Sequence, residues 1–140
     1  MSGASCIFCR IVSGEIPGQI VHTSERALAF LDAQPLADGH VLVVPRRHAA
    51  RVVDLEPEDA AALFRTVAAL AGPVARATGA EGLTIGVNDG PLTGQTVPHV
   101  HVHIVPRHRD DGATSIHGMF QMGARRPVAE MAEAIRRASA

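Results

Sequence analysis

The chain has 140 residues, of which 46% are hydrophobic and 3% aromatic, and its formal net charge is -1 at pH 7. This length suits one domain, and the apolar fraction excludes wholesale disorder. The near-neutral charge gives no reason to expect a nucleic acid or an anionic membrane as partner. Met1–Phe8 has no basic region followed by an apolar run, and no apolar stretch approaches the roughly 18 residues of a membrane span. We therefore expect a cytoplasmic protein.

Three short strands are predicted in the first third of the chain. Ile20–Thr23 and Ala27–Leu31 are separated by the turn-like sequence Ser24-Glu25-Arg26. His40–Pro45 is a β-branched run that follows a loop and predicts the third strand. Polar residues that include His48 then lead to the next element.

The next element is one main helix. Pro57 suits the first helical position, and Thr78-Gly79 is a typical end. Because proline in a helix interior costs about 3 kcal/mol, Gly72-Pro73 predicts a kink or an early end. Apolar residues recur at spacings of three and four and give the helix one apolar stripe, formed by Ala60, Leu63, Phe64, Val67, Leu70, Ala71 and Val74.

Two more strands and a weak helix complete the chain. Leu83–Val87 predicts a fourth strand, Asn88–Gly94 a turn-rich loop and Val97–Val105 a fifth strand. Pro127–Ala138 has weak helical character. The order of three strands, a helix and two strands indicates an α+β domain, in which one main helix packs on an antiparallel sheet of about five strands.

The fifth strand carries three histidines at alternate positions. Side chains of a strand alternate between its two faces, so His99, His101 and His103 share one face. The other face is apolar and can cover the helix stripe; it carries Pro98, Val100, Val102, Ile104 and Pro106.

Three interpretations of the histidine face follow from the residues alone. A solvated polar face is one, although such faces usually consist of Lys, Glu, Thr and Ser. A three-histidine zinc site is the second, because alternate histidines on a strand have good ligand spacing, yet Asp110 and Asp111 lie outside the strand. Nucleophilic catalysis is the third. Protonation of one imidazole disfavours protonation of its neighbours, so the middle histidine could stay neutral. It could then attack phosphorus while a flanking histidine stabilises negative charge.

The motif around these histidines resembles a known family signature. Gly94-Gln95-Thr96-Val97-Pro98-His99-Val100-His101-Val102-His103-Ile104-Val105-Pro106-Arg107 is similar to the signature of the histidine-triad superfamily of nucleotidyl hydrolases and transferases. The segments 30–32, 39–45 and 88–90 support the resemblance, which runs from about Cys6 to Arg107. Pro98 and Pro73 depart from the family pattern.

The resemblance implies roles for individual residues. His101 would attack the α-phosphate of a nucleotide, His99 would orient it, and His103 would contact phosphate. Gln95, Thr96 and Asn88 match positions near the same phosphate, and Asp32 matches the acid that binds ribose hydroxyls. Asn88 could also be a turn residue, and Asp32 a loop cap. The residues that match the apolar base pocket, or that could be plain core, are Phe8, Ile11, Ile16 and Phe30.

The two cysteines form one C-x-x-C pair, Cys6 and Cys9. In a reducing compartment, metal binding or redox chemistry is more common for such a pair than a structural disulfide, and two reduced thiols are a further alternative. One branch of the resembling family pairs this motif with two histidines, which match His48 and His99. The resemblance therefore implies a closed structural zinc site, with no cofactor required for the chemistry.

The resemblance also implies an overall function. We expect a hydrolase that releases a nucleoside monophosphate, AMP, from phosphoramidates or dinucleoside polyphosphates through a covalent nucleotidyl-histidine. A nucleotidyl transferase or phosphorylase on the same scaffold, and a non-catalytic nucleotide-binding protein, are the alternatives. The family implies a purine nucleotide ligand and a homodimer that extends the sheet across both chains. We assign residues 1–140 to one domain, with a core at 1–107 and a variable tail at 108–140.

Overall fold

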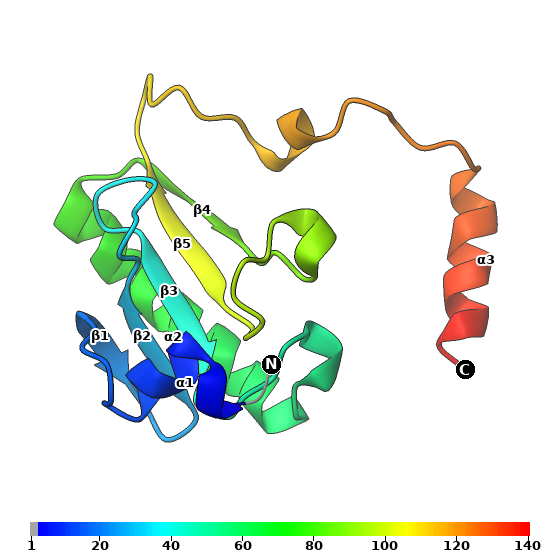
Figure 1. The fold of residues 1–140 in the computed structure, drawn as a ribbon. Coiled ribbons are helices and arrows are strands. Elements are labelled where there is room, and N and C mark those ends of the chain that lie inside the picture. The colour runs from blue at the N-terminus through cyan, green and yellow to red at the C-terminus, as the bar shows by residue number, and fades with distance from the viewer. Residues whose placement is uncertain (1–2) are drawn as a thin grey trace.

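The structure, a computed structural model, describes residues 3–140, and Met1 and Ser2 lie outside the described residues. Its centre is a five-stranded antiparallel sheet with the strand order β1-β2-β3-β5-β4. The predicted α+β class is confirmed (Figure 1). The strands are β1 (Ile20–Thr23), β2 (Ala27–Leu31), β3 (Val41–Pro45), β4 (Gly82–Gly86) and β5 (Val102–Arg107).

The main helix is α2 (Pro57–Thr78), and the early end expected at Gly72-Pro73 is wrong. Pro73 cannot donate to the carbonyl of Ala69, but both residues are exposed, so water can satisfy that carbonyl. The helix instead ends at Gly79, whose φ of 67° is the left-handed conformation that glycine adopts readily.

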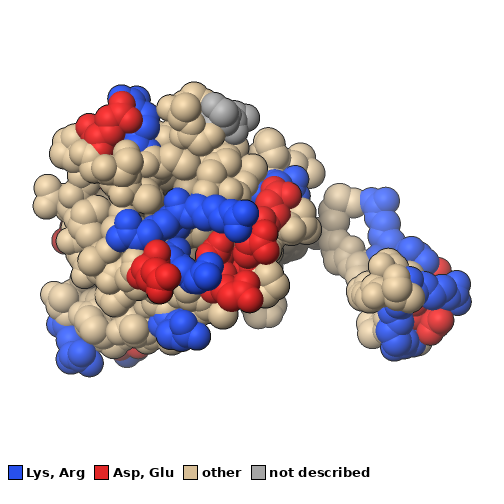
Figure 2. All heavy atoms as spheres, turned by 90° about the horizontal axis from the view of Figure 1, so that it is seen from below, with Lys and Arg blue, Asp and Glu red and all other residues tan. Residues whose placement is uncertain are grey.

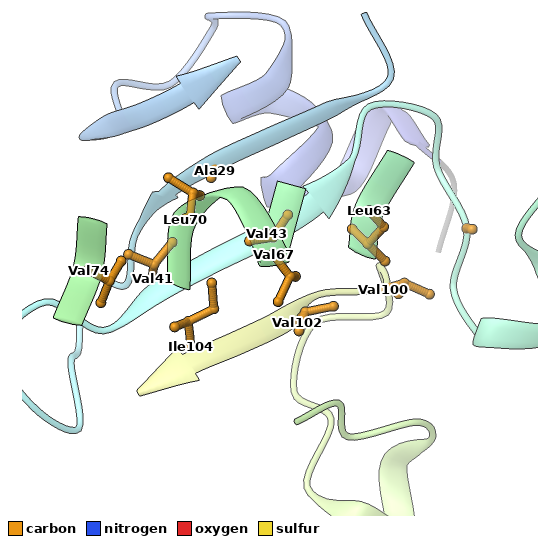
Figure 3. Close-up of a cluster of buried hydrophobic side chains, with 11 residues drawn as sticks. Ala29, Val41, Val43, Leu63, Val67, Leu70, Val74, Val100, Val102 and Ile104 are labelled. Atoms are coloured by element: carbon orange, nitrogen blue, oxygen red, sulfur yellow. The ribbon is translucent and has the colours of Figure 1, made fainter. Parts of the chain in front are cut away.

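One side of α2 covers one face of the sheet and forms the larger core (Figure 3). Phe64 is an exception to the predicted stripe, because 56% of it is exposed. It follows Leu63 by one residue, and one residue turns a helix by about 100°, which moves Phe64 off the buried side. The core side chains come from α2, β3, β5 and the segments beside them: Ala29, Val41, Val43, Ala49, Leu63, Val67, Leu70, Val74, Val100, Val102 and Ile104.

The fifth strand begins at Val102, five residues later than predicted. The backbone before it bonds elsewhere: the Val100 amide donates to the Ala49 carbonyl at 2.7 Å, and the His99 amide to the Val97 carbonyl at 2.8 Å. The predicted alternation of faces nevertheless holds, since Val100, Val102 and Ile104 all enter the core under α2. The three histidines are therefore left on the opposite side.

A short helix that the sequence did not predict, α1 (Ile7–Val12), lies on that opposite side. It contributes to a second buried cluster made of Cys6, Phe8, Leu28, Phe30, Leu42 and Val44. Successive side chains of β2 and β3 point to opposite faces of the sheet and pack alternately into the two clusters. The sheet therefore lies between α1 and α2 (Figure 1). The remaining helices are α3 (Val128–Ala138) and four short 3-10 turns: η1 (Gly3–Ser5), η2 (Val52–Asp54), η3 (Pro91–Thr93) and η4 (Ile116–Met119).

After β5 the chain leaves the body, and α3 stands apart from the sheet (Figure 1). The expected helix in Pro127–Ala138 is thus present as α3. On the face shown in Figure 2, basic and acidic side chains lie intermixed. Within residues 3–140, no helix combines the length and the apolar character that crossing a membrane would need.

Candidate functional site

The three histidines lie together on the face opposite α2. His99 and His101 precede β5 and are buried, whereas His103 lies on β5 and is half-buried. The ring centroids of His101 and His103 are 4.9 Å apart. One face therefore presents successive imidazoles, as the alternation predicted.

The backbone fixes which nitrogen of His101 is free. Its Nδ1 lies 2.7 Å from the carbonyl oxygen of His99. A carbonyl can only accept a hydrogen bond, so Nδ1 carries the proton and, in a neutral ring, Nε2 keeps a lone pair. The ring of Phe8 meets that of His101 edge-on at 5.1 Å. His101 thus has a nucleophilic nitrogen in a partly apolar setting.

His103 is held by a fourth histidine, His40, which the sequence offered only as the first residue of an apolar strand. His40 is 2% exposed, and its Nε2 lies 2.9 Å from Nδ1 of His103. The amide of Leu36 donates to Nδ1 of His40 at 3.1 Å, and a carboxylate oxygen of Asp32 lies 3.7 Å from the same nitrogen. The signal that could have found His40 is a histidine at the start of a strand that is otherwise wholly apolar.

Burial keeps these imidazoles neutral near pH 7. It lowers the pKa of His103 to about 4, with smaller contributions from His101 and His40. Burial also lowers the pKa of His40, against the attraction of Asp32. At neutral pH, His40 and His103 are therefore neutral rings, in which the position of each proton decides which nitrogen donates.

A second group of side chains, which we call the metal cluster, consists of Cys6, Cys9, His48 and His99. Its ligand atoms lie within 4.8 Å of one another. Nδ1 of His99 is 3.4 Å from the Cys6 sulfur and 3.5 Å from the Cys9 sulfur, and Nδ1 of His48 is 3.4 Å from the Cys9 sulfur. Tetrahedral zinc would hold sulfur and nitrogen ligands about 3.6 Å apart. The sequence thus predicted four residues that converge as a ligand set.

The chemistry of the metal cluster also fits a cation. Nε2 of His99 donates to the carbonyl of Pro45 at 2.8 Å, which turns the Nδ1 lone pair toward the thiols. Burial lowers the pKa of His99 to about 4, so the ring is neutral, as a ligand must be. Burial and the neighbouring Cys6 raise the pKa of Cys9 to about 11, so a bound cation is what would make this thiol a thiolate.

A third group, the His40 cluster of Asp32, His40 and His103, is as compact as a ligand set. Its nitrogens, however, are already engaged. Nδ1 of His40 accepts from Leu36, and Nε2 of His40 lies against Nδ1 of His103. This cluster is therefore a hydrogen-bonded network.

The loop that precedes the histidines is tied down by Gln95. Its Oε1 accepts from the Gly90 amide at 2.7 Å, while its Nε2 donates to the carbonyls of Ala50 at 2.9 Å and Val97 at 3.1 Å. Gln95 thus shapes the loop with both ends of its amide. Thr96, next to it, is exposed, and Asn88 is half-buried.

Asp89, near the start of the same loop, binds the segment at Arg51 and Val52. It accepts from the Val52 amide at 2.8 Å and pairs with Arg51 at 3.2 Å. That hydrogen bond and the guanidinium lower the pKa of Asp89. Gly90 has a φ of 113° and packs against Arg51, so a side chain there would be strained and crowded.

The residues matched to a base pocket lie in two environments. Phe8 and Phe30 are buried against each other, with ring centroids 5.4 Å apart, and Ile11 packs beside them. Ile16 is half-buried outside that cluster. Asp32 caps its loop with one carboxylate oxygen, which accepts from the Gln34 amide at 2.9 Å, and turns the other toward His40.

Comparison with known proteins adds independent findings. A sequence profile of the HIT domain matches residues 13–110. An uncharacterized HIT-like protein of Methanocaldococcus jannaschii is 43% identical over 107 residues, which are 76% of this chain and 82% of that protein. Adenosine 5'-monophosphoramidase hnt1 of Schizosaccharomyces pombe is 39% identical over 107 residues, 76% of this chain and 77% of that protein. An asymmetrical bis(5'-nucleosyl)-tetraphosphatase of the same yeast is 38% identical over 96 residues, 69% of this chain and 53% of that protein.

Two solved structures extend the likeness to three dimensions. A hypothetical protein from Leishmania major superposes with a TM-score of 0.86 at 37% identity, covering 99% of this chain and 96% of that one. A Zn-bound histidine triad family protein from Mycobacterium smegmatis superposes with a TM-score of 0.74 at 37% identity, covering 79% of this chain and 80% of that one.

Proposed function

Because the chain belongs to the HIT, or histidine-triad, family, we propose that it is a nucleotidyl hydrolase that releases AMP from phosphoramidates or dinucleoside polyphosphates. The observation that carries the proposal is the free Nε2 of His101, which the His99 carbonyl fixes by holding Nδ1. The relatives named as a phosphoramidase and a tetraphosphatase support the substrate class.

The reaction proceeds in two displacements. Nε2 of His101 attacks the α-phosphorus, a phosphorus–nitrogen bond forms, and the bond to the leaving amine or phosphate breaks as that group takes a proton. Water then attacks the same phosphorus, its hydroxyl stays on the nucleotide, and the phosphorus–histidine bond breaks. The second proton of the water replaces the one that left with the first product, so the enzyme is regenerated and AMP is released.

Neighbouring side chains serve this chemistry. His103, Thr96 and Asn88 stabilise the negative charge on the phosphoryl oxygens. Gln95 holds the loop that carries Thr96 in place through three backbone partners. Asp32 binds the ribose hydroxyls. The purine base lies against the apolar side of α1, where the contributing residues are Phe8, Ile11, Ile16 and Phe30.

The metal cluster would hold one zinc ion through Cys6, Cys9, His48 and His99. Four protein ligands leave no open position, so the ion would supply structural support and no reaction chemistry. It would join the N-terminal segment to the first histidine of the triad. A pair of thiol ligands suits a reducing compartment, and we place the protein in the cytoplasm.

The functional unit is a homodimer. β4 lies at the edge of the sheet, where unpaired backbone groups are free to extend it. Ile85 on β4 is 42% exposed, and the outward Phe64 lies on α2, which contacts β4. A two-fold contact through β4 and α2 would cover both side chains and continue the sheet into a second copy. Light scattering that showed a monomer at micromolar concentration would contradict this assembly.

The test of the function is the variant His101→Asn. It should reduce hydrolysis of an adenosine phosphoramidate by more than about a thousandfold, because no other side chain forms the covalent bond. Thr96→Ala removes one phosphate contact and should cost about tenfold to a thousandfold. His117→Asn, in the exposed tail, is the matched control and should retain full activity.

Intact-mass analysis of quenched enzyme should show a nucleotide adduct on His101 during turnover. Near-normal activity of His101→Asn, or an adduct at another residue, would refute the proposal. Products formed in the presence of inorganic phosphate separate hydrolysis from transfer: a hydrolase yields AMP, and a phosphorylase yields ADP.

A further inference from the structure

The helix α1 carries side chains that belong to two sites at once. Cys6, directly before the helix, and Cys9, within it, are half of the metal cluster. Phe8 lies between them, is buried, and meets the ring of His101 edge-on at 5.1 Å. Phe8 also packs on Phe30, with ring centroids 5.4 Å apart, so it forms part of the apolar pocket proposed for the base. The metal cluster and the nucleotide site therefore share one structural element.

Side chains attach α1 to the rest of the molecule. In the described part of the chain, the backbone hydrogen bonds of Cys6–Ile16 all have their partners within residues 3–16. A helix of six residues is also too short to be stable by itself. Two attachments hold α1 in place: the metal cluster, and the second buried cluster, to which Phe8 and the partly buried Ile11 and Val12 contribute.

The other half of the metal cluster is fixed independently of α1. Nε2 of His99 donates to the carbonyl of Pro45 at 2.8 Å. His48 lies beside Ala49, whose carbonyl accepts from the Val100 amide at 2.7 Å. Removal of a bound cation would therefore leave the two histidines in place and release the two cysteines. Apolar packing would then be the remaining attachment of α1.

We propose that zinc at the metal cluster and the nucleotide bind cooperatively, with α1 as the element that couples them. A base against Phe8 restrains the helix from one side, and a cation on Cys6 and Cys9 restrains it from the other. The second ligand to bind meets a helix that is already ordered, so the entropy cost of ordering it is smaller. By linkage, each ligand raises the affinity of the other by the same factor. The place of the base rests on the proposed function, whereas the attachment of α1 by the metal cluster does not.

The attachment of α1 can be measured without a nucleotide. Metal-free protein is prepared with a chelator and a reductant that keeps both thiols reduced, and its ¹⁵N–¹H spectrum is compared with that of zinc-loaded protein. The amide signals of Ile7–Val12 should broaden or move toward random-coil positions on metal removal, while those of α2, Val102 and Ile104 keep their positions. Unchanged α1 signals would overturn the proposal. Loss of the α2 signals as well would also overturn it, because the metal would then support the whole fold and not α1.

The coupling itself is measured with AMP as the probe. In calorimetric titrations, zinc-loaded protein should bind AMP about tenfold more tightly than metal-free protein. Saturating AMP should tighten zinc binding by the same factor, measured by competition with a chromogenic chelator. Equal AMP affinities of the two forms would overturn the proposal. Failure of zinc-loaded protein to bind AMP would refute the proposed function and leave the spectroscopic result on α1 standing.

A matched pair of variants tests whether α1 carries the coupling. Phe8→Ala and Phe30→Ala each remove one ring of the same pocket and should both weaken AMP binding, but Phe8 lies on α1 and Phe30 on β2. The coupling factor should fall from about tenfold to about twofold in Phe8→Ala and stay near tenfold in Phe30→Ala. Equal coupling factors in the two variants would overturn the proposal. If Phe8→Ala does not fold with zinc bound, Ile11→Ala on the same helix takes its place, with the same expected loss of coupling.

Discussion

The metal cluster and the His40 cluster contain the first and the last histidine of the triad, and each combines two imidazoles with acidic side chains, two thiols in one and a carboxylate in the other. In each, the ligand-type atoms lie within 4.8 Å of one another. In the metal cluster, the Pro45 carbonyl accepts a hydrogen bond from Nε2–H of His99, so the lone pair of Nδ1 faces two thiols. In the His40 cluster, the Leu36 amide donates to Nδ1 of His40, so the proton on Nε2 faces His103.

The difference between the clusters shows that residue type and spacing do not assign a role to an imidazole. The backbone group that holds its second nitrogen does. A carbonyl partner leaves the other ring nitrogen with a lone pair, which a ligand or a nucleophile needs, as at His99 and His101. An amide partner leaves the other nitrogen with a proton to donate, as at His40. Each of the following predictions tests whether the two clusters differ in this way.

The largest expected effect is loss of the metal. Cys6→Ser removes one of four ligands, so zinc content should fall from one per chain to nearly none, and the free energy of unfolding should drop by several kcal/mol, on the order of a quarter to a half of what a structural zinc site contributes. Elemental analysis and urea denaturation measure the two quantities. Asp32→Asn changes the His40 cluster without touching the metal cluster and is the control. Unchanged zinc in Cys6→Ser, or lost zinc in Asp32→Asn, would break the comparison.

A smaller effect concerns pH and His103. Its folded pKa of about 4 lies below its ordinary value of 6.5, so between these values the unfolded chain binds more protons. The stability contributed by the neutral ring is therefore complete above pH 6.5 and is lost as the pH falls toward 4. The loss should be about 2 kcal/mol once the partial exposure of His103 is allowed for.

Urea denaturation of the wild-type protein and of His103→Gln at several pH values between 7 and 4 measures this contribution. The metal cluster is common to both proteins, so its own pH dependence cancels in their difference. His117→Gln should follow the wild-type curve. Parallel curves for wild type and His103→Gln would show that the His40 cluster does not hold His103 in its neutral form.

The smallest effect is expected at Phe8, which packs against the metal cluster at His99 and against His101, the histidine between the two clusters. Its ring meets His99 at 5.9 Å and His101 at 5.1 Å, both edge-on. Phe8→Leu keeps the apolar volume but loses these ring contacts, and should lower the free energy of unfolding by about 1 kcal/mol while leaving zinc content intact. Phe120→Leu, in the exposed tail, should change neither quantity. Loss of zinc in Phe8→Leu would mean that the metal cluster depends on packing as much as on its ligands.

The sequence alone determined the class of fold and the main constellations of the site. Alternation and three-to-four spacing are local properties, so β1 and β2 have the predicted bounds, α2 begins at the predicted Pro57, and the three histidines share one face. The resemblance supplied the four residues of the metal cluster, which the structure brings together.

Only the tertiary structure decided the rest, because it depends on partners far away in the chain. Solvent beside Pro73 lets α2 continue, and bonding of Val100 to Ala49 delays β5 until Val102. The protons of the site are set in the same way: the Pro45 carbonyl reaches His99 across 54 residues, and His40 reaches His103 across 63. No local pattern encodes which backbone group meets a given imidazole, since that contact exists only once the sheet has brought the strands into register.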